Sequence, residues 1–227
     1  MKHEPLRQRT RWALLLGLLV LLAGCAAPQR QPSPDAGVWN DALFGPPAQA
    51  PDPGAIFALT GEMQRYLDER IRPQARRRTA QSALLDALYA QRELRLEYDA
   101  SFTRNAHQAF EARMGNCLSL VIMTGAFAQE LGLMVRYQEV LGPPAVERNG
   151  GLTFLVGHVN VAMGSRPRDL PISTQQEHWV TVDFLPGQDL GRQRTQEIGI
   201  ERVRAMFMNN RAAEELSRGR PDDAYAW

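Results

Sequence analysis

The stretch RMGNCLSLVIMTGAFAQELG, from Arg113 to Gly132, decides how the rest of the sequence is interpreted. After Asn116 its residues are apolar almost all round a helical projection, which predicts a helix that is buried on every side. Gly132 is a natural stop for that helix. Cys117 stands where the helix begins and is one of two cysteines in the 227-residue chain. The stretch therefore predicts a core helix with a thiol at its N-terminus.

The other cysteine lies in an export signal. The basic segment MKHEPLRQRTR is followed by WALLLGLLVLLAGC, whose apolar run of about 12 residues is too short to span a bilayer but is typical of a secretory signal. Its end, LLAGC, resembles the lipobox of bacterial lipoproteins. The resemblance implies cleavage before Cys25, acylation of Cys25, and an outer-membrane anchor facing the periplasm, since Ala26 is not an aspartate. The alternatives are an ordinary signal peptide cut near Ala27 and an uncleaved anchor.

An acylated Cys25 would leave Cys117 without a partner in an oxidising compartment, where cysteines are usually paired. Such a thiol is either an inert core residue or a nucleophile. The 26 basic and 25 acidic side chains nearly balance, and removal of residues 1–24 leaves a slightly acidic chain. We therefore expect no nucleic-acid binding.

Composition divides the chain into four parts. Prolines and small polar residues predict a flexible tether after the signal, although Trp39, Leu43 and Phe44 are able to dock on the domain. The predicted parts are a signal peptide at 1–24, a tether at 25–54, a domain at 55–200 and C-terminal helices at 201–227.

Apolar periodicity predicts helices first and strands afterwards. Strands following helices are typical of an α+β fold, here with an antiparallel sheet packed on the Cys117 helix. The predicted helices are 56–71 (ended by Pro73), 79–94 and 104–115, and the predicted strands are 133–141, 152–163 and 177–186, with the turn PPAVERNGG between the first two strands.

Three residues of reactive types follow one another through this core: Cys117, His158 within VGHVNVA, and Asp183 within WVTVDF. A thiolate attacks a carbonyl carbon, an imidazole takes and returns the proton, and a carboxylate fixes the imidazole tautomer. A helix N-terminus lowers a thiol pKa, and its N–H groups can bind an oxyanion. Because strand side chains alternate, His158 and Asp183 would meet if their strands are antiparallel neighbours.

The segments GNCLSLVIMTGAFAQELGLMVRYQEV, GHVNVAM and HWVTVDF resemble the transglutaminase-like superfamily over roughly residues 98–190. The resemblance implies a papain-related fold with Cys117 as nucleophile, His158 as base and Asp183 as the acid that orients the base. Some relatives carry tetratricopeptide repeats after this domain. The segment ERVRAMFMNNRAAEELSRGRPDDAYAW resembles one incomplete repeat of that kind, which we expect to pack against the domain because a single unit builds no stack.

Other residues near these motifs have secondary roles in the prediction. His178 is a competing base at the entrance of the third strand, and His107 is interpreted as a surface or structural residue. Asn105 and Asn116 are candidates for oxyanion binding, and Trp179 for a wall of the substrate pocket.

The sequence favours neither a metal nor another cofactor. It contains no CxxC and no HExxH, and it offers a single thiol if Cys25 is acylated, whereas structural and catalytic zinc sites need three or four ligands at such spacings.

These features predict a lipoprotein whose cysteine hydrolase domain acts by acyl transfer on an amide in a peptide or protein. The superfamily includes peptidases, amidases and cross-linking enzymes, and hydrolysis is the favoured reaction. Cross-linking of the chain to itself through lysine is excluded, because Lys2 is its only lysine and lies in the signal. The alternatives are a binding or assembly module that uses the C-terminal helices for protein contacts, and a truncated member of a longer repeat protein.

Overall fold

The computed structural model describes residues 40–89, 94–149, 151–165, 179–185 and 194–227. The chain divides into two compact units, Met1–Leu43 and Phe44–Trp227. In the first unit the described part holds a short 3-10 turn, η2 (Asp41–Leu43). The predicted signal peptide, Cys25 and His178 lie outside the described residues.

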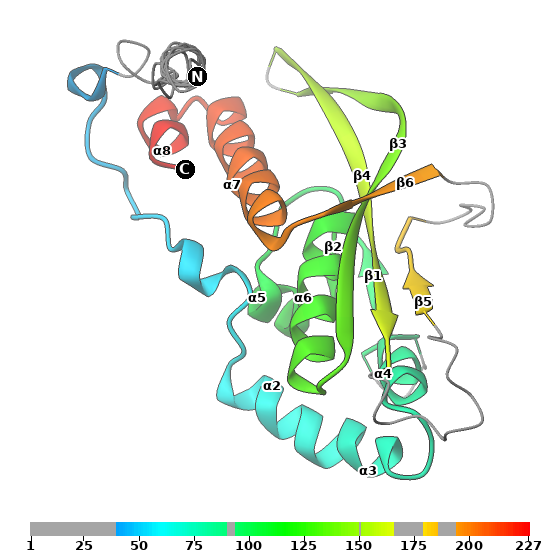
Figure 1. The fold of residues 1–227 in the computed structure, drawn as a ribbon. Coiled ribbons are helices and arrows are strands. Elements are labelled where there is room, and N and C mark those ends of the chain that lie inside the picture. Colours follow the sequence, from blue (N-terminus) through cyan, green and yellow to red (C-terminus); the bar gives the residue numbers. More distant parts are fainter. Residues whose placement is uncertain (1–39, 90–93, 150, 166–178, 186–193) are drawn as a thin grey trace, which may run out of the picture. The chain divides into compact units, whose positions relative to one another are not determined.

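The second unit is built on one antiparallel sheet (Figure 1). Its four strands lie in the order β5-β4-β3-β6, and each is antiparallel to its neighbours. The strands are β3 (Met134–Asn149), β4 (Leu152–Gly164), β5 (Trp179–Val182) and β6 (Arg194–Ile198). Helices packed with a curled antiparallel sheet confirm the predicted α+β class.

One strand boundary was predicted wrongly, and one strand was not predicted. The segment PPAVERNGG, expected as a turn, continues β3 as far as Asn149, with a register shift between Val140 and Ala145. The shift contains Pro143 and Pro144, which lack the N–H of a regular ladder and are tolerated at such a bulge. Strand β6 was not predicted, because RTQEI has no apolar alternation and its strand is fixed by pairing with β3.

The helices precede the sheet, apart from a C-terminal pair. They are η3 (Pro53–Ile56), α2 (Gly61–Tyr66), the π-helical η4 (Leu67–Ile71), α3 (Arg72–Ala75), α4 (Ala80–Tyr89), α5 (Ala106–Ala112), α6 (Cys117–Glu130), α7 (Ile200–Ser217) and α8 (Pro221–Ala226). Pro73 does not end the first helix as predicted. It lies in the first turn of α3, a position where the missing N–H costs little.

Helix α6 is the centre of the core, as its composition predicted. Every residue from Cys117 to Ala128 is buried. The helix contacts both β3 and β4 on one side and α5 on another. Phe127 packs edge-on against Phe110 of α5, with ring centroids 5.8 Å apart. Apolar side chains therefore pack against α6 on more than one side, and their burial stabilises the position of the helix.

The chain makes a tight entry into α6. A short parallel pair joins β1 (Glu97–Tyr98) to β2 (Met114–Gly115), directly before the helix. Arg113 ends α5 in the left-handed conformation, with φ of 53°. A Cβ on Gly115 would stand 2.7 Å from the Cβ of Ser119, so only glycine fits where the chain turns into the helix.

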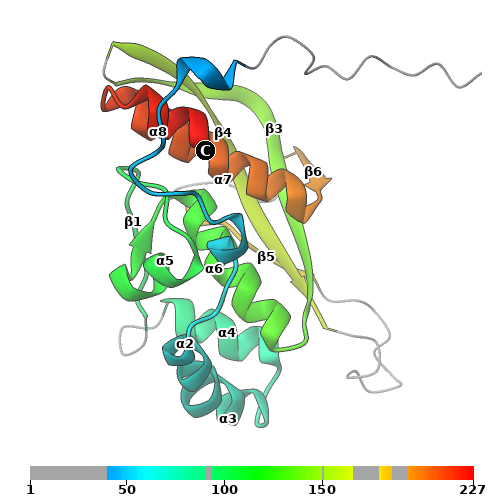
Figure 2. The same cartoon turned by 90° about the vertical axis from the view of Figure 1, so that its left-hand side faces the viewer.

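The C-terminal helices belong to the same unit as the sheet. Figure 2 shows the chain before α2 running past α8. The Phe44 ring stacks on Tyr225 of α8 at 3.8 Å, and the N–H groups of Gly45 and Ala48 donate to Asp222 and Asp223. The end of the segment predicted as a tether is thus bound to α8 from Phe44 onward, while Trp39 lies outside the described residues.

No helix in the described ranges is long and apolar enough to cross a membrane.

Gly125 gives a test of how tightly α6 is packed. A Cβ there would collide with the Tyr137 side chain, including a ring carbon at 2.8 Å. We expect Gly125→Ala to lower the free energy of unfolding by about 1–3 kcal/mol, the usual cost of overpacking, as measured by urea denaturation. The matched control is Gly61→Ala in α2, where the nearest atom is 4.0 Å away. Equal effects of the two substitutions would contradict this packing.

Candidate functional site

His158 and Asp183 come together at the neighbouring strands β4 and β5. Strand β5 pairs with Val161–Gly164 of β4, and Asp183 follows its last residue. The His158 Nε2 atom lies 2.9 Å from Asp183 Oδ1 and 2.8 Å from Oδ2. The predicted meeting of these two side chains across the sheet is therefore present in the structure.

This contact fixes the direction of the hydrogen bond. An ionised carboxylate only accepts, so Nε2 must carry the proton and donate it. Asp183 is 3% exposed at its side chain, and its Oδ1 also accepts the N–H of Leu185 at 2.9 Å. A neutral His158 ring then presents the lone pair of Nδ1, the form that a general base requires.

Cys117 is the first residue of α6 and is 9% exposed. Burial raises the pKa of its thiol, while the backbone N–H groups of Val159, Leu118 and Cys117 itself lower the pKa. The charge of Asp183 also raises this pKa. The thiol is therefore in the neighbourhood of the His158–Asp183 pair, beside the backbone of the residue that follows His158.

The predicted lowering of the Cys117 pKa was wrong in direction. The N–H groups at the helix N-terminus do lower the thiol pKa, but burial of the thiol away from water raises it by more. No hydrogen bond joins the Cys117 thiol to the His158 ring in the described part of the chain. Burial thus favours the neutral form of the Cys117 thiol by raising its pKa, and His158 and Asp183 form their own hydrogen bond.

Asn105 and Asn116, the two predicted oxyanion donors, are helix caps. Asn105 forms a capping box with Gln108 at the start of α5. The side-chain oxygen Oδ1 of Asn116 accepts from the N–H of Ser119 at 2.9 Å, and the side-chain nitrogen Nδ2 donates to the Thr103 hydroxyl at 2.8 Å. The side chains of both residues are therefore engaged in capping contacts.

Trp179 lies at the start of β5 and opposite Gly164 of β4. A Cβ on Gly164 would come within 3.0 Å of the indole ring, and the Arg136 guanidinium lies 3.8 Å above it. Trp179 therefore covers the end of the sheet, and these contacts account for its position without a substrate. His107 is half-buried on α5.

Tyr89 is a neighbour of the site that the sequence did not reveal. It ends α4, and its ring stacks on Phe184 with centroids 6.0 Å apart. Burial, with a smaller contribution from the Asp183 charge, raises the pKa of Tyr89 to about 12. Tyr89 is nevertheless 50% exposed, so it forms a rim beside the carboxylate. Only the fold brings α4 to this place, since about 90 residues separate Tyr89 from Asp183.

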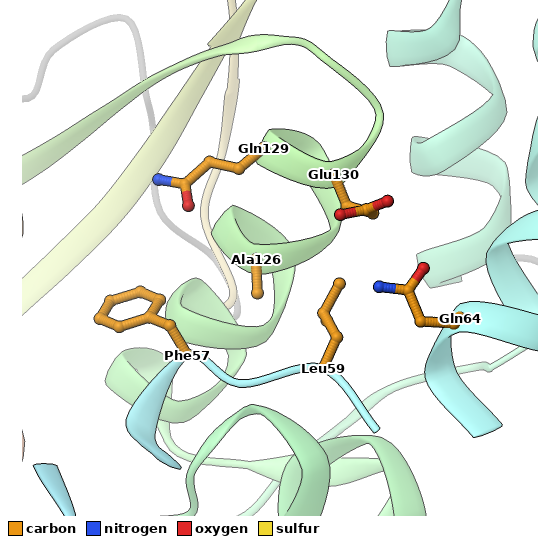
Figure 3. Close-up of a pocket in the computed structure, with 6 residues that line it drawn as sticks. All are labelled: Phe57, Leu59, Gln64, Ala126, Gln129 and Glu130. Carbon is orange, nitrogen blue, oxygen red and sulfur yellow. The ribbon is translucent and has the colours of Figure 1, made fainter. Parts of the chain in front are cut away.

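A pocket of about 380 Å³ opens near the other end of α6 (Figure 3). Its lining residues are Phe57, Leu59, Gln64, Ala126, Gln129 and Glu130. Ala126 is nine residues along the helix from Cys117, which is about 14 Å at the rise of an α-helix. The pocket is therefore separate from the His158–Asp183 pair.

The described residues contain no group of three or more His, Cys, Asp or Glu side chains that would hold a metal ion.

Comparison with known proteins finds no matching family model, curated protein or solved structure. The resemblance of the sequence motifs to the transglutaminase-like superfamily therefore stays a prediction.

The burial of Cys117 predicts a high thiol pKa. In a Cys25→Ser background Cys117 is the single thiol, and we expect its alkylation by iodoacetamide to have a midpoint above the value of about 8.5 for a free cysteine. Unfolding in urea should return the midpoint to that value. A folded-state midpoint below 8.5 would contradict the dominance of burial.

The same shift predicts a stability change with pH. Because the folded pKa is raised, the stabilisation is fully present below about pH 8.5 and is lost as pH rises through the folded pKa. Urea denaturation should therefore show a shallower loss of stability above pH 8.5 for Cys117→Ala than for the parent. Parallel losses would contradict the assignment to Cys117.

Proposed function

We propose that this protein is a cysteine-dependent amide hydrolase with a transglutaminase-like, papain-related fold, and that it acts on a peptide or protein by acyl transfer. The observation that carries the proposal is the hydrogen bond between His158 and the buried carboxylate of Asp183, formed near a thiol at a helix N-terminus. The three residue types needed for nucleophilic catalysis come from α6, from β4 and from the end of β5.

The neutral thiol determines the order of proton transfer. Cys117 would lose its proton to Nδ1 of His158 as its sulfur forms a bond with the amide carbonyl carbon, rather than reacting from a preformed thiolate. The resulting imidazolium is stabilised by Asp183 through Nε2. His158 then returns the proton to the leaving amine as the C–N bond breaks. Water, activated by the same imidazole, releases the acyl group from Cys117.

Backbone groups supply the oxyanion site in this mechanism. The N–H groups that lower the Cys117 pKa are those of Val159, Leu118 and Cys117. Donors that stabilise a thiolate also lie within reach of the oxygen of a tetrahedral intermediate formed on that sulfur. The missing hydrogen bond between the thiol and the ring is expected to form when substrate binds, because catalytic contacts are often long in empty sites.

We further propose that the protein is a lipoprotein anchored in the outer membrane and facing the periplasm. The support is the signal-like N-terminus, the sequence LLAGC, and Ala26 after the cysteine. No cofactor is part of the proposed chemistry.

A second candidate function is a catalytically weak binding or assembly module. The observation that favours it is the burial of Cys117 with a raised thiol pKa, as expected for a small core residue. In that case α7 and α8 would provide the protein contact surface.

Acylation of Cys117 tests the proposed hydrolase. In the Cys25→Ser background, p-nitrophenyl acetate at pH 7.5 should release nitrophenol in a burst and leave an acetyl group on Cys117, detected by intact mass and peptide mapping. His158→Ala should slow acylation by about 10²–10⁴-fold, the usual value of a general base. Asp183→Asn should also slow acylation, because an amide no longer holds the His158 ring in the tautomer that a general base requires.

Thr124→Val is the control, because Thr124 lies on the same helix and its hydroxyl has no hydrogen-bond partner within the described ranges. An acylation rate that is the same in the parent and in His158→Ala would favour the binding module.

Lipidation is tested separately. The full chain expressed in a bacterium should incorporate labelled palmitate and sediment with outer membranes, and Cys25→Ala should lose the label. Label retained in Cys25→Ala would overturn the proposed anchor.

A further inference from the structure

We propose that Thr103 is a positioning residue that fixes the start of α6 to the C-terminal helix α7, so that α7 helps to hold the nucleophile in place. The inference rests on the proposed function of Cys117 and deepens it. It assigns to the C-terminal helices a part in the site rather than a separate contact surface.

Thr103 lies in the loop before α5 and is 1% exposed. Its Oγ1 accepts a hydrogen bond from Asn116 Nδ2 at 2.8 Å and another from Asn210 Nδ2 at 3.3 Å. Its N–H donates to Glu214 Oε1 at 2.7 Å. One buried residue therefore connects the cap of α6 to two side chains one turn apart on α7.

The other side of Asn116 is held as well. Its side-chain oxygen Oδ1 accepts from both the N–H and the hydroxyl of Ser119, at 2.9 and 2.8 Å. The Ser119 hydroxyl in turn accepts the N–H of Arg104 at 2.8 Å. The amide of Asn116 is thus fixed at both its oxygen and its nitrogen, which leaves it one rotamer in this structure.

The α7 end of the connection is itself anchored. Glu214 Oε2 accepts from Arg211 Nη1 at 2.8 Å, and these two side chains are only 18% and 13% exposed. The Arg211 guanidinium lies 4.0 Å from the centroid of the Phe102 ring. Because the ion pair is largely shielded from water, it holds α7 against residues 102–104 more firmly than a surface pair would.

The consequence for Cys117 follows from its position. Asn116 is the N-cap and Cys117 the next residue, so the cap fixes where the first turn begins and where the N–H groups of Cys117 and Leu118 point. These N–H groups lie beside the sulfur. Loss of the Thr103 hydroxyl would free the Asn116 amide and loosen the donors that must meet an oxyanion.

Two reagents separate positioning from mere access to the thiol. Iodoacetamide needs only an ionised, accessible sulfur, whereas p-nitrophenyl acetate also needs the base and the oxyanion donors. In the Cys25→Ser background we expect Thr103→Val to lower the ratio of acylation to alkylation rate at pH 7.5 by about tenfold, less than the hundredfold that a 1 Å misplacement can cost. Thr103→Ser, which keeps the hydroxyl, should restore the ratio to within about twofold of the parent.

Thr124→Val is the matched control, since it makes the same substitution in the core without breaking a hydrogen bond among the described residues, and it should leave the ratio unchanged. Glu214→Gln is a nearly isosteric second probe, for use if circular dichroism shows that Thr103→Val does not fold. It should lower the ratio by a smaller factor than we expect for Thr103→Val. A ratio unchanged in the folded Thr103 or Glu214 variant would overturn the inference.

The two proposals fail in different ways. If His158→Ala abolishes acylation while the Thr103 and Glu214 variants retain the parent ratio, the hydrolase stands and the positioning role is wrong. If the parent is acylated no faster than Cys117→Ala, the hydrolase is wrong and the positioning role falls with it.

Discussion

Burial of α6 on every side is the constraint on which the rest of the structure depends. Its residues from Cys117 to Ala128 have no face left for water, so helices and sheet must surround it. Because an apolar helix of this kind cannot slide or turn without losing contacts on several sides, its first residue is held in one place. The thiol of Cys117 is therefore positioned by the core of the protein and not by a surface loop.

The same burial sets the chemical character of the site. It raises the pKa of the Cys117 thiol, whereas the backbone N–H groups around the sulfur lower that pKa. In the proposed mechanism a neutral thiol needs a base at the moment of attack, and His158, which is hydrogen-bonded to the buried carboxylate of Asp183, would be that base. In the proposed mechanism, the burial that disfavours a thiolate would make the His158–Asp183 pair necessary for reaction.

Most of the α+β pattern could be predicted from the sequence, because α6 is continuously apolar and β4 and the first half of β3 have clear strand periodicity. Side-chain alternation placed His158 and Asp183 to meet if their strands were antiparallel neighbours, and β4 and β5 are such neighbours. The extent of β3 and the presence of β6 could not be predicted, since pairing with neighbouring strands overrides local signals there. The position of Pro73 in the first turn of α3 was not predicted either, although proline is tolerated at such a position.

The candidate site was predictable in its residues but not in its electrostatics. The residue types gave the order Cys117, His158, Asp183, whereas the burial that reverses the thiol pKa depends on packing that no local pattern contains. Likewise Asn116 was recognised as a polar residue near the thiol. Its hydrogen bond to Thr103 became visible only in the structure, where Thr103 also accepts a hydrogen bond from Asn210 of α7.

The tautomer of His158 shows whether its Nδ1 atom is able to accept the proton of Cys117. Long-range ¹H–¹⁵N correlation spectra of the protein at pH 8, with the His158 signals assigned by comparison with His158→Gln, show which ring nitrogen carries the proton. We expect a protonated Nε2 bound to Asp183 and an unprotonated Nδ1 available as base, and we expect Asp183→Asn to disturb this state. A proton on Nδ1 in the neutral ring would contradict the account, because His158 could not then accept the proton of Cys117.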